Sequence, residues 1–306
     1  MGKKFTLNQI PDMTGKVCIV TGGNTGIGKV CVSELAKKNA HVIVASRTPS
    51  KALATIEEIK AETKSDKIEF IQLDLLSLAS VTKFIAEFKA KNLPLHLLLN
   101  NAGVMACPFA LSEDGIESQF ATNHLAHFYL TTQLLPILEQ SQPSRIVNVS
   151  SSAHKMLFLH GFNLDNLNDE SKYSPSIVYA RTKTCNVLFT RELDQRLQKK
   201  GVKTLYVNSN HPGIVRTELV RHNGPVLNAI IRQFSVDAND GAITQMYLAT
   251  SPEVESKDIH GKYYVPYAEP SAPSGYATTQ ENQTKLWDLS EKILSEKVPG
   301  YAGAGI

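Results

Sequence analysis

The stretch "SIVYARTK" at 176–183 places a phenol and an ammonium four residues apart, as Tyr179 and Lys183. If the stretch is helical, both side chains lie on one face. A phenol has a pKa of about 10 and transfers protons poorly at neutral pH. An ammonium at about 4 Å, with an effective dielectric constant of about 20, would bring that pKa towards about 7. The spacing predicts an acid–base tyrosine, although a Tyr-x-x-x-Lys pair alone also occurs on solvated helix faces.

A second group of residues could hold a phosphate. The segment "TGGNTGIG" places Gly22, Gly26 and Gly28 between an apolar run at 17–21 and a helical pattern at 26–39. Glycine allows a tight turn and a close approach of the backbone to a ligand, and a helix N-terminus offers free N–H groups. The spacing and context predict a dinucleotide-binding loop.

The residue type that would bind a ribose 2′-hydroxyl is missing after this loop. A carboxylate is expected about 20 residues on, but no Asp or Glu occurs between Glu34 and Glu57, and the chain has Ser46 and Arg47 instead. An arginine can pair with a 2′-phosphate, which a carboxylate would repel. We therefore expect NADP(H) rather than NAD(H), unless Arg47 is only a solvated surface residue. Asp74 either starts a helix or accepts the adenine amino group.

The chain that must position these residues alternates between strand and helix patterns. We expect strands at 17–21, 41–46, 67–74, 95–101, 144–151, 202–209 and 262–266, and helices at 26–39, 50–64, 77–91, 113–140, 176–200, 238–250 and 280–297. Alternation of this kind predicts an α/β fold with a single Rossmann-type, doubly wound parallel sheet and helices on both faces. No linker is evident, so we interpret 1–306 as one domain. The irregular segments 152–175 and 210–237 are expected at the substrate mouth.

Composition limits the other function classes. The 306 residues carry a formal net charge of +3, too small to argue for nucleic acid or an anionic membrane. No apolar run approaches the roughly 18 residues needed to span a bilayer, and the N-terminus lacks a signal-peptide core. The four cysteines show no metal-ligand spacing. We expect a cytoplasmic protein with no integral membrane segment and no bound metal.

Taken together, the motifs resemble the short-chain dehydrogenase/reductase family over about 14–300. They are "TGGNTGIG", "NNAG" (100–103), "NHLAHF" (123–128), "NVSS" (148–151), "YARTK" (179–183) and "NHPGIVRTEL" (210–219), in the family's order. Several of them, with the late "LWDLSEKIL", look most like the branch that contains the retinol dehydrogenases. That branch often carries an N-terminal membrane anchor, which is not visible here.

The resemblance implies catalytic roles for four residues. Tyr179 matches the acid–base that protonates a carbonyl oxygen, and Lys183 matches the residue that lowers its pKa and binds the nicotinamide ribose. Ser151 matches the serine that bonds the substrate oxygen, and Asn123 the helix asparagine that joins Lys183 to a proton relay through water. Since neighbours on a strand point to opposite faces, only some of Ser150, Ser151 and Ser152 can face the site.

The resemblance also implies a cofactor-binding set. Besides Tyr179 and Lys183, we expect this set to comprise Gly22, Asn24, Thr25, Gly26, Ile27, Gly28, Arg47, Asp74, Leu75, Asn101, Ala102, Gly103, Pro212, Gly213, Val215 and Thr217. The apolar segment 218–236 is expected to be a lid over the substrate, a packed helix or a membrane-surface contact. The resemblance further allows a homo-oligomer formed through 113–140 and 176–200.

These inferences predict an NADP(H)-dependent oxidoreductase that interconverts a carbonyl and an alcohol on an apolar small molecule. Two alternatives stay open. One is a reductase of an activated carbon–carbon double bond, because "YARTKTCN" also resembles a segment of light-dependent protochlorophyllide reductases. The other is a non-enzymatic NADP(H)-binding regulator, which would not need Tyr179 and Lys183.

Overall fold

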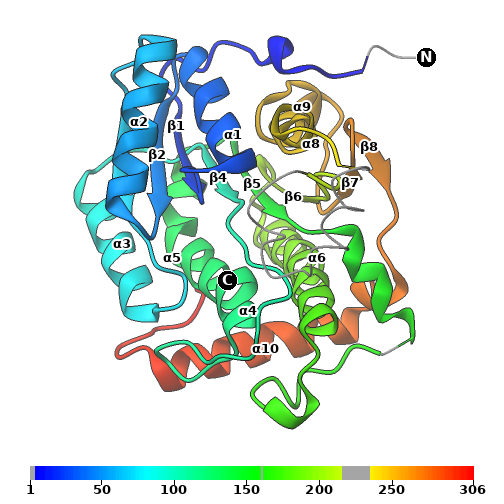
Figure 1. The fold of residues 1–306 in the computed structure, drawn as a ribbon. Helices are drawn as coiled ribbons and strands as arrows, with labels where there is room; N and C mark the ends of the chain where they lie inside the picture. The colour runs from blue at the N-terminus through cyan, green and yellow to red at the C-terminus, as the bar shows by residue number, and fades with distance from the viewer. Residues whose placement is uncertain (1–3, 160, 216–234) are drawn as a thin grey trace.

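The computed structural model describes residues 4–159, 161–215 and 235–306, and its centre is an eight-stranded sheet (Figure 1). The strands are β1 (Val17–Thr21), β2 (His41–Ser46), β3 (Ile68–Gln72), β4 (Leu97–Asn100), β5 (Ser144–Val149), β6 (Leu205–Asn210), β7 (Tyr263–Val265) and β8 (Glu269–Ser271). Their order is β3-β2-β1-β4-β5-β6-β7-β8. The pairings from β3 to β7 are all parallel, which confirms the doubly wound sheet.

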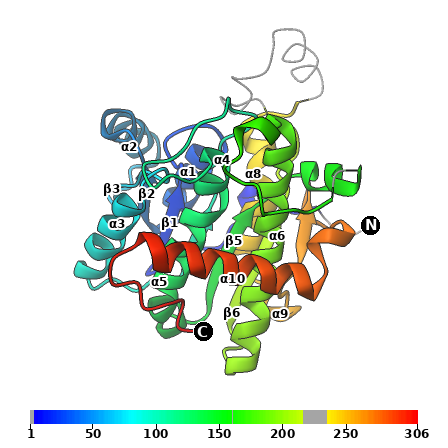
Figure 2. The same cartoon turned by 90° about the horizontal axis from the view of Figure 1, so that it is seen from below.

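Helices cover both faces of the sheet (Figures 1 and 2). The α-helices are α1 (Gly26–Lys37), α2 (Pro49–Thr63), α3 (Leu78–Ala90), α4 (Ser118–Phe120), α5 (Ala126–Gln140), α6 (Pro175–Lys200), α8 (Ala238–Thr250), α9 (Glu253–Ser256) and α10 (Gln280–Lys297). Short 3-10 helices are η1 (Leu7–Gln9), η3 (Ser152–Leu159), η4 (Glu170–Lys172) and η6 (Gly275–Ala277), and η2 (Ala121–Leu125) is a π-helix. None of the described helices combines the length and the apolar character needed to cross a membrane.

Strand β1 shows why the apolar runs form this sheet. All five of its residues are buried, and successive side chains point to opposite faces. Val17 and Ile19 belong to the core beneath α3, α5 and α6, whereas Cys18 and Val20 belong to the core beneath α1, α2 and α8. A strand that is buried on both faces needs apolar residues at every position, which explains the continuous run.

One expectation about the elements is wrong, and one strand is not among those expected. The helix expected at 113–140 begins only at Ser118, because the fully buried Glu117 side chain accepts hydrogen bonds from the amides of Gln119 and Phe120 and caps the first turn. In addition, the sheet does not end at the strand predicted at 262–266. Strand β8 follows it and pairs with β7 in the antiparallel direction.

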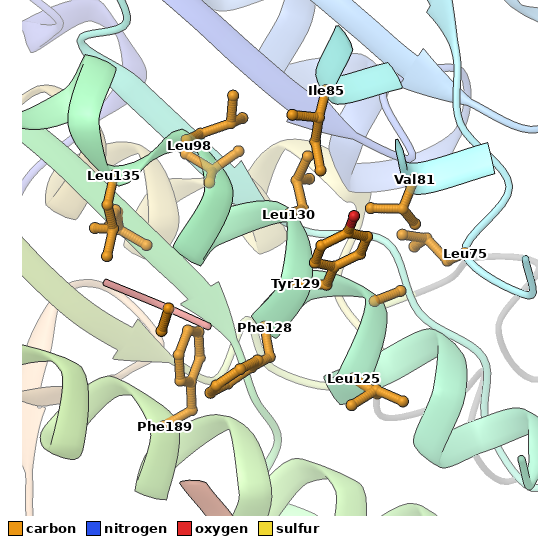
Figure 3. Close-up of a cluster of buried hydrophobic side chains, with 14 of the residues drawn as sticks. Leu75, Val81, Ile85, Leu98, Leu125, Phe128, Tyr129, Leu130, Leu135 and Phe189 are labelled. Atoms are coloured by element: carbon orange, nitrogen blue, oxygen red, sulfur yellow. The ribbon is translucent and has the colours of Figure 1, made fainter. Parts of the chain in front are cut away.

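The C-terminal helix α10 lies across α5 and α6 (Figure 2). The Trp287 ring packs 4.9 Å, between centroids, from Phe128 of α5, and the Arg196 guanidinium lies 4.1 Å from the Trp287 ring centre. Figure 3 shows Phe128 beside Phe189 of α6 within the same apolar cluster. These contacts attach the C-terminal helix to α5 and α6.

The strand order reverses direction between β1 and β4, which are neighbours although two strands separate them in sequence. Their connections lead to helices on opposite faces, so a crevice opens at the carboxyl ends of these two strands. Gly22 follows β1 and Asn101 follows β4, directly at this crevice. The fold therefore places the glycine loop where open α/β sheets bind ligands.

Candidate active site

One groove at the carboxyl edge of the sheet brings most of the expected site residues together. Its volume is about 220 Å³. It is lined by Gly22, Thr25, Gly26, Ile27, Gly28, Asn101, Ala102, Gly103, Val149, Ser150, Ser151, Tyr179, Lys183, His211, Pro212 and Gly213. These residues follow the ends of β1, β4, β5 and β6 or lie on α1 and α6. Val149, Ser150 and His211 are not in the predicted set of site residues, although each lies within a quoted motif.

The glycine loop has the geometry of a phosphate cradle. Gly22 and Gly26 have φ of 67° and 52°, which glycine adopts without strain. A Cβ on Gly28 would lie 2.6 Å from Asn101 Nδ2 and would clash with the Gly22 carbonyl oxygen. Thr25 starts α1 without a side-chain cap, so the helix's first N–H groups face the groove without a capping oxygen. Both features fit the pyrophosphate of a dinucleotide.

The end of β2 fits the adenosine side of such a cofactor. Ser46 Oγ is buried and has no hydrogen-bond partner among the described residues, which is a costly state for a hydroxyl unless a ligand satisfies it. The next residue, Arg47, is exposed, and its carbonyl oxygen accepts a hydrogen bond from Gln72 Nε2 at 3.1 Å. This bond holds the Arg47 backbone at the carboxyl end of β2.

Tyr179 and Lys183 lie on α6 and are both buried. Lys183 Nζ lies 5.7 Å from the centre of the Tyr179 ring and donates to the Val149 carbonyl at 3.0 Å. Burial raises the pKa of Tyr179 to about 12, opposed by a hydrogen bond with Ser151, and burial lowers the pKa of Lys183 to about 8. The expectation that Lys183 alone brings the tyrosine towards 7 is wrong, because desolvation of the phenolate outweighs attraction at this distance.

Two adjacent serines after β5 point in different directions. Ser150 Oγ is buried and donates to the Lys183 carbonyl at 2.6 Å, which ties the strand end to α6. Ser151 Oγ accepts from the Ala153 amide at 3.1 Å and hydrogen-bonds Tyr179. Of this pair, Ser151 therefore presents its hydroxyl to the tyrosine, while Ser150 fixes the backbone around Lys183.

Asn123 lies in the π-helix η2, behind the groove. Its Oδ1 accepts from the Val104 amide at 2.8 Å, and its Nδ2 donates to the Val104 carbonyl and to Thr182 Oγ1, each at 2.9 Å. A Cβ on Gly103 would lie 3.1 Å from Asn123 Oδ1 and 3.4 Å from Lys183 Nζ. Glycine at 103 therefore lets the loop after β4 lie directly against the asparagine and the lysine. Single π-turns of this kind recur at functional sites.

Several expected cofactor residues lie outside the groove lining. Asn24 accepts from Thr55 Oγ1 through its carbonyl at 3.0 Å, which ties the glycine loop to α2. Asp74 Oδ1 accepts from the Leu76 amide at 3.0 Å, as a helix-start residue does. The Leu75 side chain packs in the core near Val81 and Tyr129 (Figure 3), so its place in the cofactor-binding set stays a prediction.

Two further expectations concern the chain after β6. Val215 is buried and bridges Val236 in the parallel direction, and a Cβ on Gly241 would lie 2.6 Å from Val215 Cγ2 and 3.2 Å from Ile27 Cδ1. Val215 thus lies close to the glycine loop. Thr217, and the segment 218–236 apart from its last two residues, lie outside the described residues.

His211, which sequence reasoning missed, lines the groove opposite the glycine loop. Its amide donates to the Tyr264 carbonyl at 2.8 Å, which attaches it to β7. Burial, followed by the charges of His154, Lys155 and Lys183, lowers its pKa to about 4. The ring is therefore neutral at pH 7 and adds no positive charge beside Lys183.

A larger cavity, of about 710 Å³, lies elsewhere, between the N-terminal segment and the turn after β7. Four of its lining residues are aromatic: Phe5, Tyr247, Tyr264 and Tyr267. It contains neither the glycine loop nor the Tyr179 hydroxyl. Size alone therefore does not identify the reaction site, and the smaller groove carries the chemistry. Among the described residues, no group of His, Cys, Asp or Glu side chains could hold a metal ion.

A Rossmann-type sheet with a glycine loop at its switch point and a buried Ser–Tyr–Lys group defines a nucleotide-dependent oxidoreductase class. The family model of short chain dehydrogenases matches residues 16–163. The chain belongs to the short-chain dehydrogenase family, and its similarity to retinol dehydrogenases confirms the branch suggested by the motifs.

Individual relatives are similar along nearly the whole chain. Short-chain dehydrogenase TIC 32 A, chloroplastic, from Brassica napus is 42% identical, covering 92% of this chain and 89% of the relative. Human retinol dehydrogenase 12 is 39% identical, covering 92% and 87%. A crystal structure of an uncharacterized protein from Mycobacterium paratuberculosis is 34% identical, covers 96% and 98%, and superposes with a TM-score of 0.76. The chain is thus an oxidoreductase of a family whose members use nicotinamide cofactors.

Proposed function

We propose that this protein is an NADP(H)-dependent carbonyl reductase or alcohol dehydrogenase for an apolar small molecule. The observation that carries the proposal is the convergence of Ser151, Tyr179 and Lys183 on the groove that also contains the glycine loop. A phenol and a serine hydroxyl in mutual contact can together bind one carbonyl oxygen, and the phenol can give it a proton.

The chain's own groups supply binding, orientation and proton transfer, while a bound nicotinamide would supply the hydride. Ser151 Oγ, already accepting from an amide, directs its hydrogen towards the substrate oxygen. Tyr179 donates its proton to that oxygen during reduction and removes it during oxidation. Lys183 is held next to the tyrosine by the Val149 carbonyl, so its ammonium stabilises the phenolate as the proton leaves.

The cofactor preference rests on the end of β2. Gly22, Gly26 and Gly28 would hold the pyrophosphate, and Arg47 with the unpartnered Ser46 hydroxyl would hold a 2′-phosphate. No carboxylate occupies position 46 or 47, where it would repel that phosphate. These features favour NADP(H) over NAD(H).

An apolar substrate is supported by exposed side chains around the groove. Met156 and Ile214 are 48% and 50% exposed. Met156 follows Ser151 on η3, and Ile214 follows Gly213 of the groove lining. Large apolar side chains gathered beside an opening commonly mark a ligand or contact surface. Met156 and Ile214 belong to 152–175 and 210–237, the segments that we propose form the substrate mouth.

The test is consumption of NADPH with a panel of ketones, aldehydes and enones, apolar and polar, followed by identification of each product. We expect alcohols from apolar carbonyl compounds. A saturated ketone formed from an enone would instead favour the double-bond reductase. Tight NADPH binding without turnover of any compound would favour the non-enzymatic regulator.

A cytoplasmic location and self-association stay predictions. The name of the Brassica napus relative places that relative in the chloroplast. Because α10 lies across α5 and α6, a partner subunit could pack only on those parts of the two helices that α10 does not contact.

A further inference from the structure

A buried histidine lies directly behind the serine of the proposed active site. His154, on η3, has no exposed surface, and its Nδ1 lies 2.6 Å from the Ser151 carbonyl oxygen. Its other nitrogen, Nε2, lies 3.1 Å from the backbone nitrogen of Ser274, more than a hundred residues later. Each ring nitrogen therefore has one backbone partner.

These partners determine the tautomer. An amide N–H can only donate, so Nε2 must accept from Ser274, and the ring proton must be on Nδ1. Nδ1–H then donates to the Ser151 carbonyl, which can only accept. Burial, assisted by the charge of Lys155, lowers the pKa of His154 and keeps this neutral form at pH 7. A protonated ring would place two donors, Nε2–H and the Ser274 N–H, against each other.

The bond acts on the orientation of Ser151. Its carbonyl accepts twice from His154, from the ring at 2.6 Å and from the backbone amide at 3.2 Å. Its hydroxyl accepts from the Ala153 amide. With the Ser151 carbonyl held by His154 and the Ser151 hydroxyl oxygen held by the Ala153 amide, the hydroxyl hydrogen is directed towards Tyr179.

The same ring connects this turn to the C-terminal part of the chain. Figures 1 and 2 show η3 beside the segment that leads from β8 to α10. The His154 ring packs edge-on against Tyr263 of β7, with centroids 5.0 Å apart. The Tyr263 hydroxyl is buried without a partner among the described residues, and its pKa is raised by burial and by the charge that Tyr179 would carry. Tyr263 and Ser274, both in the segment 263–277, thus contact the His154 ring behind Ser151.

We propose that His154 is a positioning residue for Ser151, and that it couples the serine's orientation to the segment 263–277 through the Ser274 amide. This inference rests on the proposed carbonyl chemistry. The segment 263–277 lies outside the residues matched by the family model. It also contains neither the glycine loop nor the Tyr-x-x-x-Lys motif.

The first test replaces the ring. His154→Phe keeps an aromatic ring against Tyr263 but removes both hydrogen bonds, and we expect kcat to fall about ten-fold or more. The Kd for NADPH should stay within about two-fold, because the glycine loop is not touched. His154→Asn keeps a donor near the position of Nδ1 and should recover most of kcat. Equal kcat in wild type and His154→Phe, with both proteins folded, would overturn the proposal.

The second test removes only the distal bond. Ser274 has a φ of −64°, which proline adopts, so Ser274→Pro deletes the N–H without demanding a new backbone angle. Ser274→Ala deletes the hydroxyl, which donates weakly to the His154 carbonyl at 3.5 Å, and keeps the N–H. We expect Ser274→Pro to lower kcat about three-fold or more and Ser274→Ala to resemble wild type. Wild-type kcat in both variants would rule out the coupling to 263–277.

A third readout is independent of turnover. The ¹⁵N chemical shifts of the imidazole in wild type should report a neutral Nδ1–H ring at pH 7, and the Ser274→Pro variant should alter the Nε2 shift. An Nε2–H ring in wild type would overturn the proposal whatever the kinetics show. If no carbonyl compound is reduced and Tyr179→Phe changes nothing, the proposed function fails instead. The tautomer then still decides whether His154 holds Ser151.

Discussion

The glycine loop after β1 and the hydroxyl–ammonium group between β5 and α6 lie on the same groove, but different contacts hold them. The loop depends on backbone conformation and on missing Cβ atoms, as at Gly28, where a methyl group would clash. The catalytic group depends on side-chain hydrogen bonds between distant elements. Ser150 bonds the Lys183 carbonyl, and Lys183 bonds the Val149 carbonyl.

This difference explains how each region can fail. A backbone-determined loop tolerates change in its surroundings but not the addition of a single methyl group. A side-chain network tolerates small changes of shape but loses its function when one donor or acceptor is removed, because the buried partner is left unsatisfied. Variants in the two regions should therefore separate cofactor affinity from turnover.

The largest effect is expected for Tyr179→Phe. The substitution removes one hydroxyl and keeps the ring that α6 buries, so the Tm and the Kd for NADPH should change little. Turnover of a carbonyl substrate should fall by about 10²–10⁴, the range for loss of a general acid. Steady-state kinetics and a binding titration on the same sample measure both quantities. Near-normal turnover in this variant would contradict the assigned role.

Gly28→Ala should weaken the binding of NADPH, which Tyr179→Phe leaves almost unchanged. The new methyl group would meet the Gly22 carbonyl and Asn101 Nδ2, so the loop must shift, and the Kd for NADPH should rise about ten-fold or more. Gly275→Ala is the matched control, because its Cβ meets no heavy atom within 4 Å. Equal NADPH affinity in both variants would show that the loop is not the phosphate site.

The double variant Ser46→Asp/Arg47→Ala tests whether the end of β2 determines the preference for NADPH over NADH. A charge-assisted hydrogen bond contributes roughly 1.5–3 kcal/mol, and about 1.4 kcal/mol is one decade in Kd. The ratio of the NADH and NADPH dissociation constants should therefore fall by about ten-fold or more in this variant. Equal dissociation constants for NADH and NADPH in the wild type would contradict the proposed preference for NADPH. Turnover with saturating cofactor should remain, because Tyr179 and Lys183 are untouched.

The smallest effect concerns pH and Lys183. Its folded-state pKa, lowered to about 8 by burial, lies below the ordinary value of 10.5. Between these values the unfolded chain holds a proton that the folded chain has released, so the free energy of unfolding gains a contribution that increases with pH. Lys183→Met should lack this contribution. Urea denaturation of both proteins at pH 8 and pH 10 measures the difference, and parallel curves would mean that Lys183 is not desolvated.

The amino-acid sequence by itself determined the strand–helix alternation, the parallel sheet and the glycine loop. Each of these depends on periodicity or on local backbone freedom, which neighbouring residues carry. The third helix illustrates the point: it is expected at 77–91, and the Ser77 hydroxyl caps it by accepting from the Ser80 amide. The antiparallel β8 was not predicted, because three residues around a proline carry too short a pattern.

Only the tertiary structure decided the chemistry around the catalytic group. The pKa of Tyr179 depends on how deeply α6 is buried and how far Lys183 Nζ lies from the phenol, and neither follows from a four-residue spacing. The link from Ser151 through His154 to Ser274 joins residues more than a hundred positions apart. Desolvation and hydrogen-bond partners are properties of what packs around an atom, and that packing is known only once the distant segments of the chain have come together.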